Sequence, residues 1–143
     1  MTQAEKSSFS FVDFVINECS LDFKKDRTSD FNINFDPSGN HYSKTNTFKL
    51  FLNVKVINSL KEQLIEIKTE STFQFSDNLP NLMKFFTINA PAIIFPYIRS
   101  FISSLSVQSG HKPILIPTLN LSGLAKVLES NIKVIEEETI QST

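Results

Sequence analysis

The stretch Asn89-Ala90-Pro91-Ala92-Ile93-Ile94-Phe95-Pro96-Tyr97-Ile98-Arg99, with the segment that follows it to Leu121, decides the fold of this chain. Pro91 suits the first turn of a helix, because its missing N–H costs nothing there and its φ is already helical. Pro96 lies deeper and predicts a kink or an irregular first turn. Gly110 ends the pattern, so we expect a long helix over about residues 91–108.

Apolar residues occupy more than one face of this helix. A helix that is apolar on most of its circumference is buried on most of it, whereas one small sheet covers a single side. We therefore expect a second subunit to supply the other layer, in a homotetramer built as a dimer of dimers with these helices between two sheets. The predicted interface residues form one stripe: Ile94, Ile98, Phe101 and Leu105.

Four segments ahead of the helix are typical of antiparallel strands with one solvent-facing side. They are residues 9–23, 31–35, 48–57 and 64–75. In the first segment, Val12, Phe14 and Ile16 share one face and Cys19, Leu21 and Phe23 share the other, which predicts a bulge or a change of strand partner. Asp36-Pro37-Ser38-Gly39-Asn40 has the composition of a turn.

The segment after the helix predicts a stiff apolar loop and a second helix. Pro113 and Pro117 bracket Ile114, Leu115 and Ile116, and Ser122 is a candidate N-cap for a helix with Leu124, Val127, Leu128 and Ile135 on one side. Strands followed by helices indicate an α+β fold: a four-stranded antiparallel sheet, a long helix, a crossover loop and a second helix. We expect one domain over residues 9–135, a disordered N-terminus over 1–8 and an acidic flexible tail over 136–143.

Bulk properties exclude several classes of protein. The chain has 143 residues and a formal net charge of −1, which gives no general attraction to nucleic acid or to an anionic membrane. Its single cysteine, Cys19, excludes an intramolecular disulfide framework. The first residues contain no apolar signal core, and no apolar run is long and unbroken enough to span a bilayer, so we expect a cytoplasmic protein without direct membrane insertion.

No catalytic, metal-binding or cofactor-binding motif stands out. The sequence has no P-loop, nucleophile elbow or Gly-rich dinucleotide turn, and His41 and His111 lie far apart, as expected of surface-loop histidines. We therefore predict that the protein is not an enzyme and needs no cofactor. Arg99, inside the apolar helix, has two interpretations: a charge that extends to solvent, or a buried pair with Asp13 or Glu66.

The motif Ile94-Phe95-Pro96-Tyr97-x-Arg99, followed by a small-residue helix, a Gly-x-x-Pro loop and Asn120-Leu121, resembles the SecB protein-export chaperone family. The resemblance follows the order of elements over nearly the whole chain and is specific over residues 90–124. It implies an ATP-independent holdase chaperone that keeps unfolded preproteins soluble for export. Two departures are that the loop is shorter and more apolar than in the family, and that Phe101 replaces a small or polar residue.

The apolar loop beside a Phe-rich sheet predicts a groove for extended client segments. Many weak apolar contacts in such a groove give broad specificity. The predicted client-binding residues come from the loop, the second helix and the fourth strand: Ile114, Leu115, Ile116, Leu119, Leu124, Leu128, Phe73 and Phe75.

The resemblance also implies a docking face for the export motor SecA, with Leu64 and Glu66 matching the family positions on the fourth strand. The two first-strand acids of the family fall on Ser20 and Lys24, so we expect weak docking. Two alternatives remain open. One is a specialised SecB-like chaperone for a dedicated client, such as the antitoxin of a toxin–antitoxin module, and the other is a module that binds a small apolar ligand.

Overall fold

One mixed sheet forms the base of the molecule. The computed structural model describes residues 3, 7–23 and 30–136. Four long strands, β1 (Phe9–Leu21), β2 (Phe31–Tyr42), β3 (Thr47–Asn58) and β4 (Gln63–Phe75), pair antiparallel, and β5 (Ile132–Ile135) joins the edge of β2 in parallel. The order across the sheet is β1-β4-β3-β2-β5. The predicted α+β class and the succession of sheet, long helix and second helix are confirmed.

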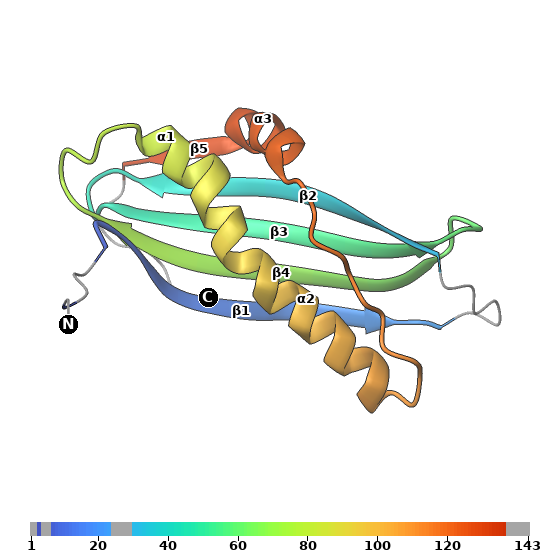
Figure 1. The fold of residues 1–143 in the computed structure, drawn as a ribbon. Helices are drawn as coiled ribbons and strands as arrows, with labels where there is room; N and C mark the ends of the chain where they lie inside the picture. Colours follow the sequence, from blue (N-terminus) through green and yellow to red (C-terminus); the bar gives the residue numbers. More distant parts are fainter. Residues whose placement is uncertain (1–2, 4–6, 24–29, 137–143) are drawn as a thin grey trace.

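The helices cover one face of this sheet, which we call the helix-side face; the opposite one is the outer face. α1 (Leu82–Lys84), a π-helical turn η1 (Phe85–Asn89) and α2 (Ala90–Gln108) follow one another without a break. Figure 1 shows α2 crossing the sheet diagonally, from the β2 side at its start to β1 at its end. Residues 111–121 then return over the same face to α3 (Ser122–Ser130), beside β2 and β5.

The core lies between α2 and the helix-side face. Strand β3 alternates strictly, because every second residue from Phe48 to Val56 is buried beneath the helix. Phe48 stacks on Phe86 with 4.1 Å between the ring centroids, which ties the sheet to the start of the helical layer. The other large side chains that are fully buried are Leu50, Leu52, Ile65, Ile67, Phe73, Ile94, Ile98, Ile102, Ile114 and Leu128.

The change of phase in β1 comes from bulges. Register shifts occur between Phe11 and Asp13 and between Ile16 and Glu18, while β4 remains the partner throughout. The bulge prediction is therefore confirmed, but the proposed faces are wrong. Val12 is exposed, whereas Phe14 and Ile16 pack against the core with Phe9 and Phe11, since the extra residues restore the same face.

Residues 36–40 do not form a turn, contrary to the composition. They continue β2, and the whole strand pairs with β3 in register. The backbone N–H of Gly39 points away from β3 and donates to the Asn131 carbonyl at 3.2 Å. The nitrogen of Pro37, two residues earlier, lies on the same side, so the proline removes no hydrogen bond of the β2–β3 ladder.

The second helix is shorter than predicted. α3 ends at Ser130, and Ile132–Ile135 form β5 instead of continuing the helix. The cause is the unpaired edge of β2, which offers hydrogen bonds to an extended segment: Gly39, Asn40, His41 and Tyr42 face Ile132, Lys133, Val134 and Ile135.

Helix α2 has one buried face and one open face. Ile94, Ile98 and Ile102 are buried against the sheet of their own chain. The outward face is exposed and mostly small, with Ala92, Pro96, Ser100, Ser104 and Val107. By length and composition alone the segment Leu82–Gln108 suffices to cross a membrane, a test that the core helix of a soluble protein also passes, and 44% of its most apolar window is buried.

Candidate functional site

The crossover loop, residues 111–121, alternates between buried and exposed side chains. Ile114 is 2% exposed and Ile116 is 6% exposed, so both are part of the core. Leu115, between them, is 76% exposed and points away from the protein. An extended backbone places successive side chains on opposite sides, so the central leucine of this apolar run must lie outside.

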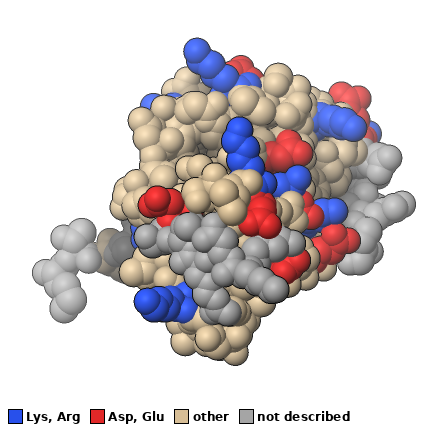
Figure 2. All heavy atoms as spheres, turned by 90° about the vertical axis from the view of Figure 1, so that its right-hand side faces the viewer, with Lys and Arg blue, Asp and Glu red and all other residues tan. Residues whose placement is uncertain are grey.

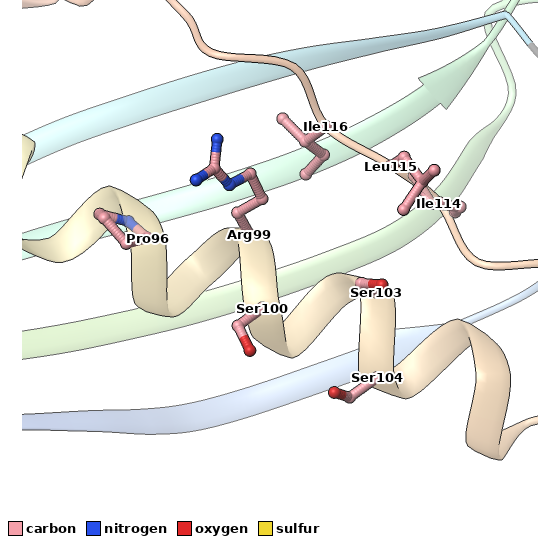
Figure 3. A pocket seen from close by; sticks show the side chains of 8 residues that line it. All are labelled: Pro96, Arg99, Ser100, Ser103, Ser104, Ile114, Leu115 and Ile116. Atoms are coloured by element: carbon pink, nitrogen blue, oxygen red, sulfur yellow. The ribbon is translucent and has the colours of Figure 1, made fainter.

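A cleft of about 390 Å³ separates the loop from α2. Figure 3 shows its side chains: Arg99 extends from the helix toward the loop, on the side where Ile116 lies. The residues that line this cleft are Pro96, Arg99, Ser100, Ser103, Ser104, Ile114, Leu115 and Ile116. We call it the helix cleft.

A second cleft, of about 410 Å³, lies on the other side of the loop. It separates the loop from the start of β2 and from the connection between β3 and β4. The residues that line it are Asp30, Phe31, Asn32, Ser59, Leu115 and Pro117, and we call it the strand cleft. Leu115 lines both clefts and is therefore the point at which they meet.

The predicted client-binding residues divide into buried and accessible ones. Phe73 and Leu128 are fully buried, and Ile114 and Ile116 nearly so. Phe75 is half-buried and packs edge-on against Phe86. Leu119 and Leu124 are half-buried at the rim of the core, and Leu115 is exposed. Among the predicted residues, the accessible apolar surface is therefore carried by Leu115 and, in part, by Phe75, Leu119 and Leu124.

Sequence reasoning did not include three further apolar side chains in the site. Phe31, Ile33 and Phe35 of β2 are half-buried on the helix-side face, next to the core, and Phe31 lines the strand cleft. Their strict alternation was the signal of a half-buried strand. The alternation did not show where the strand lies in the sheet. Within the described residues, β5 pairs with β2 only from Gly39 to Tyr42, so Phe31, Ile33 and Phe35 lie beyond the paired segment.

Arg99 follows neither of the two predicted interpretations. Its guanidinium carbon lies 5.7 Å from the centroid of the Phe95 ring, a cation–π distance, and the side chain is half-buried in the helix cleft. Glu66 pairs instead with Lys55, and Asp13 is exposed on β1. Over the described ranges 7–23 and 30–136, the ion pairs of the structure do not include Arg99.

The outer face of the sheet carries paired charges. Lys49 lies 3.1 Å from Glu70, Lys55 3.5 Å from Glu66, and Lys68 3.0 Å from Glu18. The pair with Glu18, by hydrogen bond and charge, raises the pKa of Lys68. On the end of the molecule drawn in Figure 2, cationic and anionic side chains are likewise interspersed.

The predicted motor-docking residues lie on this outer face and its border. Glu66 is half-buried, with Ser20 directly opposite it on β1. Leu64 is only 3% exposed, and its carbonyl accepts a hydrogen bond from the Asp22 N–H. Lys24 lies outside the described residues, as do residues 1–2 and 4–6 of the predicted disordered N-terminus and residues 137–143 of the predicted acidic tail.

The two histidines and the cysteine have different surroundings. His41 is half-buried in strand β2 against Phe75 and Phe86, which corrects its assignment to a surface loop, and this burial lowers its pKa. His111 stacks on Phe23 at 3.9 Å in the loop after α2. Burial raises the pKa of Cys19, which disfavours the reactive thiolate. Within the described part of the chain, no group of three or more His, Cys, Asp or Glu has the arrangement of a metal site.

The fold and the two clefts together define a small α+β protein that presents an apolar loop between open surfaces. Comparison with known proteins identifies the family: residues 10–128 match the family described as preprotein translocase subunit SecB. The chain therefore belongs to the SecB family, whose members are chaperones rather than enzymes, and a chaperone role follows from that membership.

The chain is also similar to individual proteins. An uncharacterised protein of Methanocaldococcus jannaschii is 24% identical over 137 residues, which are 91% of this chain and 83% of that protein. The protein-export protein SecB of Saccharophagus degradans is 40% identical over 45 residues, 32% of this chain and 27% of that protein. A solved SecB-like chaperone of Mycobacterium tuberculosis, in complex with a peptide from the HigA1 antitoxin, superposes with a TM-score of 0.67. That match covers 79% of this chain and 91% of the other at 11% identity, so it shows the shared fold alone.

Proposed function

We propose that this protein is an ATP-independent holdase that binds extended apolar segments of unfolded polypeptides in the cytoplasm. The observation that carries the proposal is Leu115, an exposed apolar side chain at the meeting point of two open clefts. Family membership supplies the chaperone role, and the clefts supply a surface on which a client segment would lie.

The clefts suit an extended chain better than a compact ligand. Both are open to solvent, whereas a small-molecule site encloses most of its ligand. Half-buried apolar side chains continue the surface along the β2 edge and onto α3, at Ile33, Phe35, Leu119 and Leu124. A client segment would thus bury apolar surface at many points, each worth roughly 25 cal/mol per Å². Such contacts select for apolar character and against no particular sequence.

The decisive variant is Leu115→Ser. We expect the urea midpoint of unfolding to stay unchanged, because the Leu115 side chain is already exposed to solvent in the folded protein. We also expect the variant to be less able to suppress the aggregation of an unfolded model client. Ile114→Ser is the matched comparison: it removes a core side chain and should cost about 2–5 kcal/mol of folding free energy. Full suppression by Leu115→Ser at equal stability would exclude the loop from client binding.

A specialised role for a dedicated client is the second candidate. The predicted docking face favours it, because Glu66 is already paired with Lys55 and Leu64 is buried. A face whose carboxylates are matched by lysines attracts a basic partner weakly. The solved relative that binds an antitoxin peptide offers one precedent for a dedicated client, and an antitoxin is the type of client we propose under this alternative.

We also propose that the protein forms a homotetramer, a dimer of dimers. The support is the continuous helical segment Leu82–Gln108, because more than half of its most apolar window is not buried in the single chain. The contact would use the side of α2 toward β1, where Tyr97 is exposed beside Phe11 and Phe14, so that the helix cleft on the loop side stays open to a client. Phe101 and Leu105, half-buried at the side of the helix, remain candidate interface residues, while Ile94 and Ile98 are already buried within their own chain.

A further inference from the structure

The segment that contains α1, α2 and the crossover loop carries charge of one sign. From Asn78 to Leu128 the chain has four Lys or Arg residues and no Asp or Glu, a formal charge of +4. Three of the cations, Lys84, Lys112 and Lys126, are exposed to water. Arg99 is the exception, because it is half-buried at the helix cleft.

Arg99 is held in place without being neutralised. The face of the Phe95 ring supports its guanidinium at 5.7 Å, and Phe95 is itself packed into the core against Phe35. A cation over an aromatic face is positioned by the ring quadrupole but keeps its N–H donors for other groups. The ion pairs found among residues 7–23 and 30–136 leave this charge unmatched.

The wall of the cleft combines this cation with hydroxyl donors and apolar side chains. Ser100, Ser103 and Ser104 line it from α2, and Ile114, Leu115 and Ile116 line it from the loop. A guanidinium fork with hydroxyl donors nearby matches a carboxylate, whose two oxygens accept hydrogen bonds side by side. The apolar loop side chains across the cleft would contact an aliphatic residue next to that carboxylate in the bound chain.

On this basis, and resting on the holdase function, we propose that the helix cleft binds an Asp or Glu side chain of the client. The occupant is an extended client segment in which an acidic residue has apolar neighbours: the carboxylate meets Arg99 and an apolar side chain meets Leu115. Charge complementarity favours this occupant, because the segment from Asn78 to Leu128, which includes α2 and the crossover loop, contains no Asp or Glu that could pair with the guanidinium. The clients preferred by this protein are therefore acidic-apolar segments rather than basic ones.

The test uses fluorescein-labelled peptides made of Leu, Val and Ser with one central Glu, Gln or Lys, titrated with the full-length chain and followed by fluorescence anisotropy. We expect the Glu peptide to bind about tenfold more tightly than the Gln peptide, equivalent to about 1.4 kcal/mol. Arg99→Gln should abolish this preference. Lys84→Gln, which removes an exposed cation on α1 away from both clefts, should keep it.

The variant Arg99→Glu distinguishes a charge effect from a structural one. If circular dichroism shows that its fold is intact, it should bind the Lys peptide more tightly than the Glu peptide. Equal affinity of the wild-type chain for the Glu and Gln peptides would overturn the proposal while leaving the holdase function standing. A preference that persists in Arg99→Gln would also overturn it. Failure of all three peptides to bind would overturn both proposals.

Discussion

Single residues explain how the layers fit together, and Gly39 is the sharpest case. A Cβ built on it would lie 2.7 Å from Cε1 and 2.8 Å from Cζ of Phe48. That ring has no room to move, because it is fully buried and stacked on Phe86. Glycine therefore permits the contact between β2 and the aromatic core, in a strand where glycine otherwise weakens structure.

We predict that Gly39→Ala destabilises the protein by about 1–3 kcal/mol, since overpacking outweighs the smaller gain in backbone entropy. Urea unfolding followed by circular dichroism measures the change. Gly123→Ala in α3 is the control: nothing lies within 4 Å of its added Cβ, so a gain of about 0.5–1 kcal/mol is expected. A neutral Gly39→Ala would mean that Phe48 has an alternative position.

His41 predicts a pH-dependent stability. Burial lowers its folded-state pKa below the ordinary 6.5, so the unfolded chain binds more protons in the interval between the two values. Stability contributed by the neutral imidazole is complete above the unfolded pKa and is lost as pH falls below about 6.5. The urea midpoint of unfolding should therefore fall more between pH 7.5 and pH 5.5 for the wild type than for His41→Gln.

His111→Gln serves as the comparison for that measurement, because it leaves the imidazole of His41 in its aromatic surroundings. It should retain the steeper acid dependence of the wild type. The same dependence in His41→Gln as in the wild type would assign the effect to the carboxylates instead.

At the level of elements, local sequence pattern was sufficient to predict the strands and helices whose pairing partners are close in the sequence. The alternation of residues 48–57 and 64–75 predicted β3 and β4, and Pro91 and Gly110 bounded the long helix within a residue or two. β5 was missed because its partner, the segment Gly39–Tyr42, lies far away in the chain. The pairing depends on β2 lying at the edge of the antiparallel strands, which local sequence does not show. The helical spacing of Leu124 and Leu128 was simply extended too far.

The site was predictable as a segment but not as a set of side chains. Three consecutive apolar residues, Ile114, Leu115 and Ile116, marked the loop, yet nothing local shows which of them points outward. That depends on the side of the extended loop that meets the sheet. The surroundings of Arg99 could not be predicted for the same reason. Its ring partner, Phe95, lies one helical turn earlier, and the loop residues that line the cleft come from beyond Gly110.

The outer face of the sheet makes a prediction about the export motor. We expect the export motor SecA to bind weakly, because Glu66, Glu70 and Glu18 each already pair with a lysine. Surface charges of this kind are each worth roughly 0.2–1 kcal/mol. Calorimetry at low and physiological salt measures the affinity. Salt-sensitive binding at micromolar strength that Glu66→Lys abolishes would show instead that the docking face is functional.

On the scale of the whole molecule, the uncovered face of α2 is the feature that a single chain leaves unexplained. Val107 is 54% exposed on that face, so Val107→Asp should be harmless to an isolated chain. In the proposed tetramer the same carboxylate would be buried without a partner, and the assembly should split. Phe101→Asp should split it as well, at some cost to the fold, because Phe101 also packs against the core.

Multi-angle light scattering of the wild type and both variants tests this prediction. A wild-type chain that is a stable monomer at micromolar concentration would rule the tetramer out. Val107→Asp with the wild-type mass would place the subunit interface on another surface.

The two bulges of β1 have a consequence for a protein that handles unfolded chains. Among the described strands, β1 is a long one at the edge of the sheet, with Val12 and Val15 exposed on it. Regular edges of this kind template cross-β growth, in which strand adds to strand until fibrils form. The bulges break the even ladder spacing, and Asp13 and Glu18 place a carboxylate next to each break. The edge is thereby made a poor seed for amyloid.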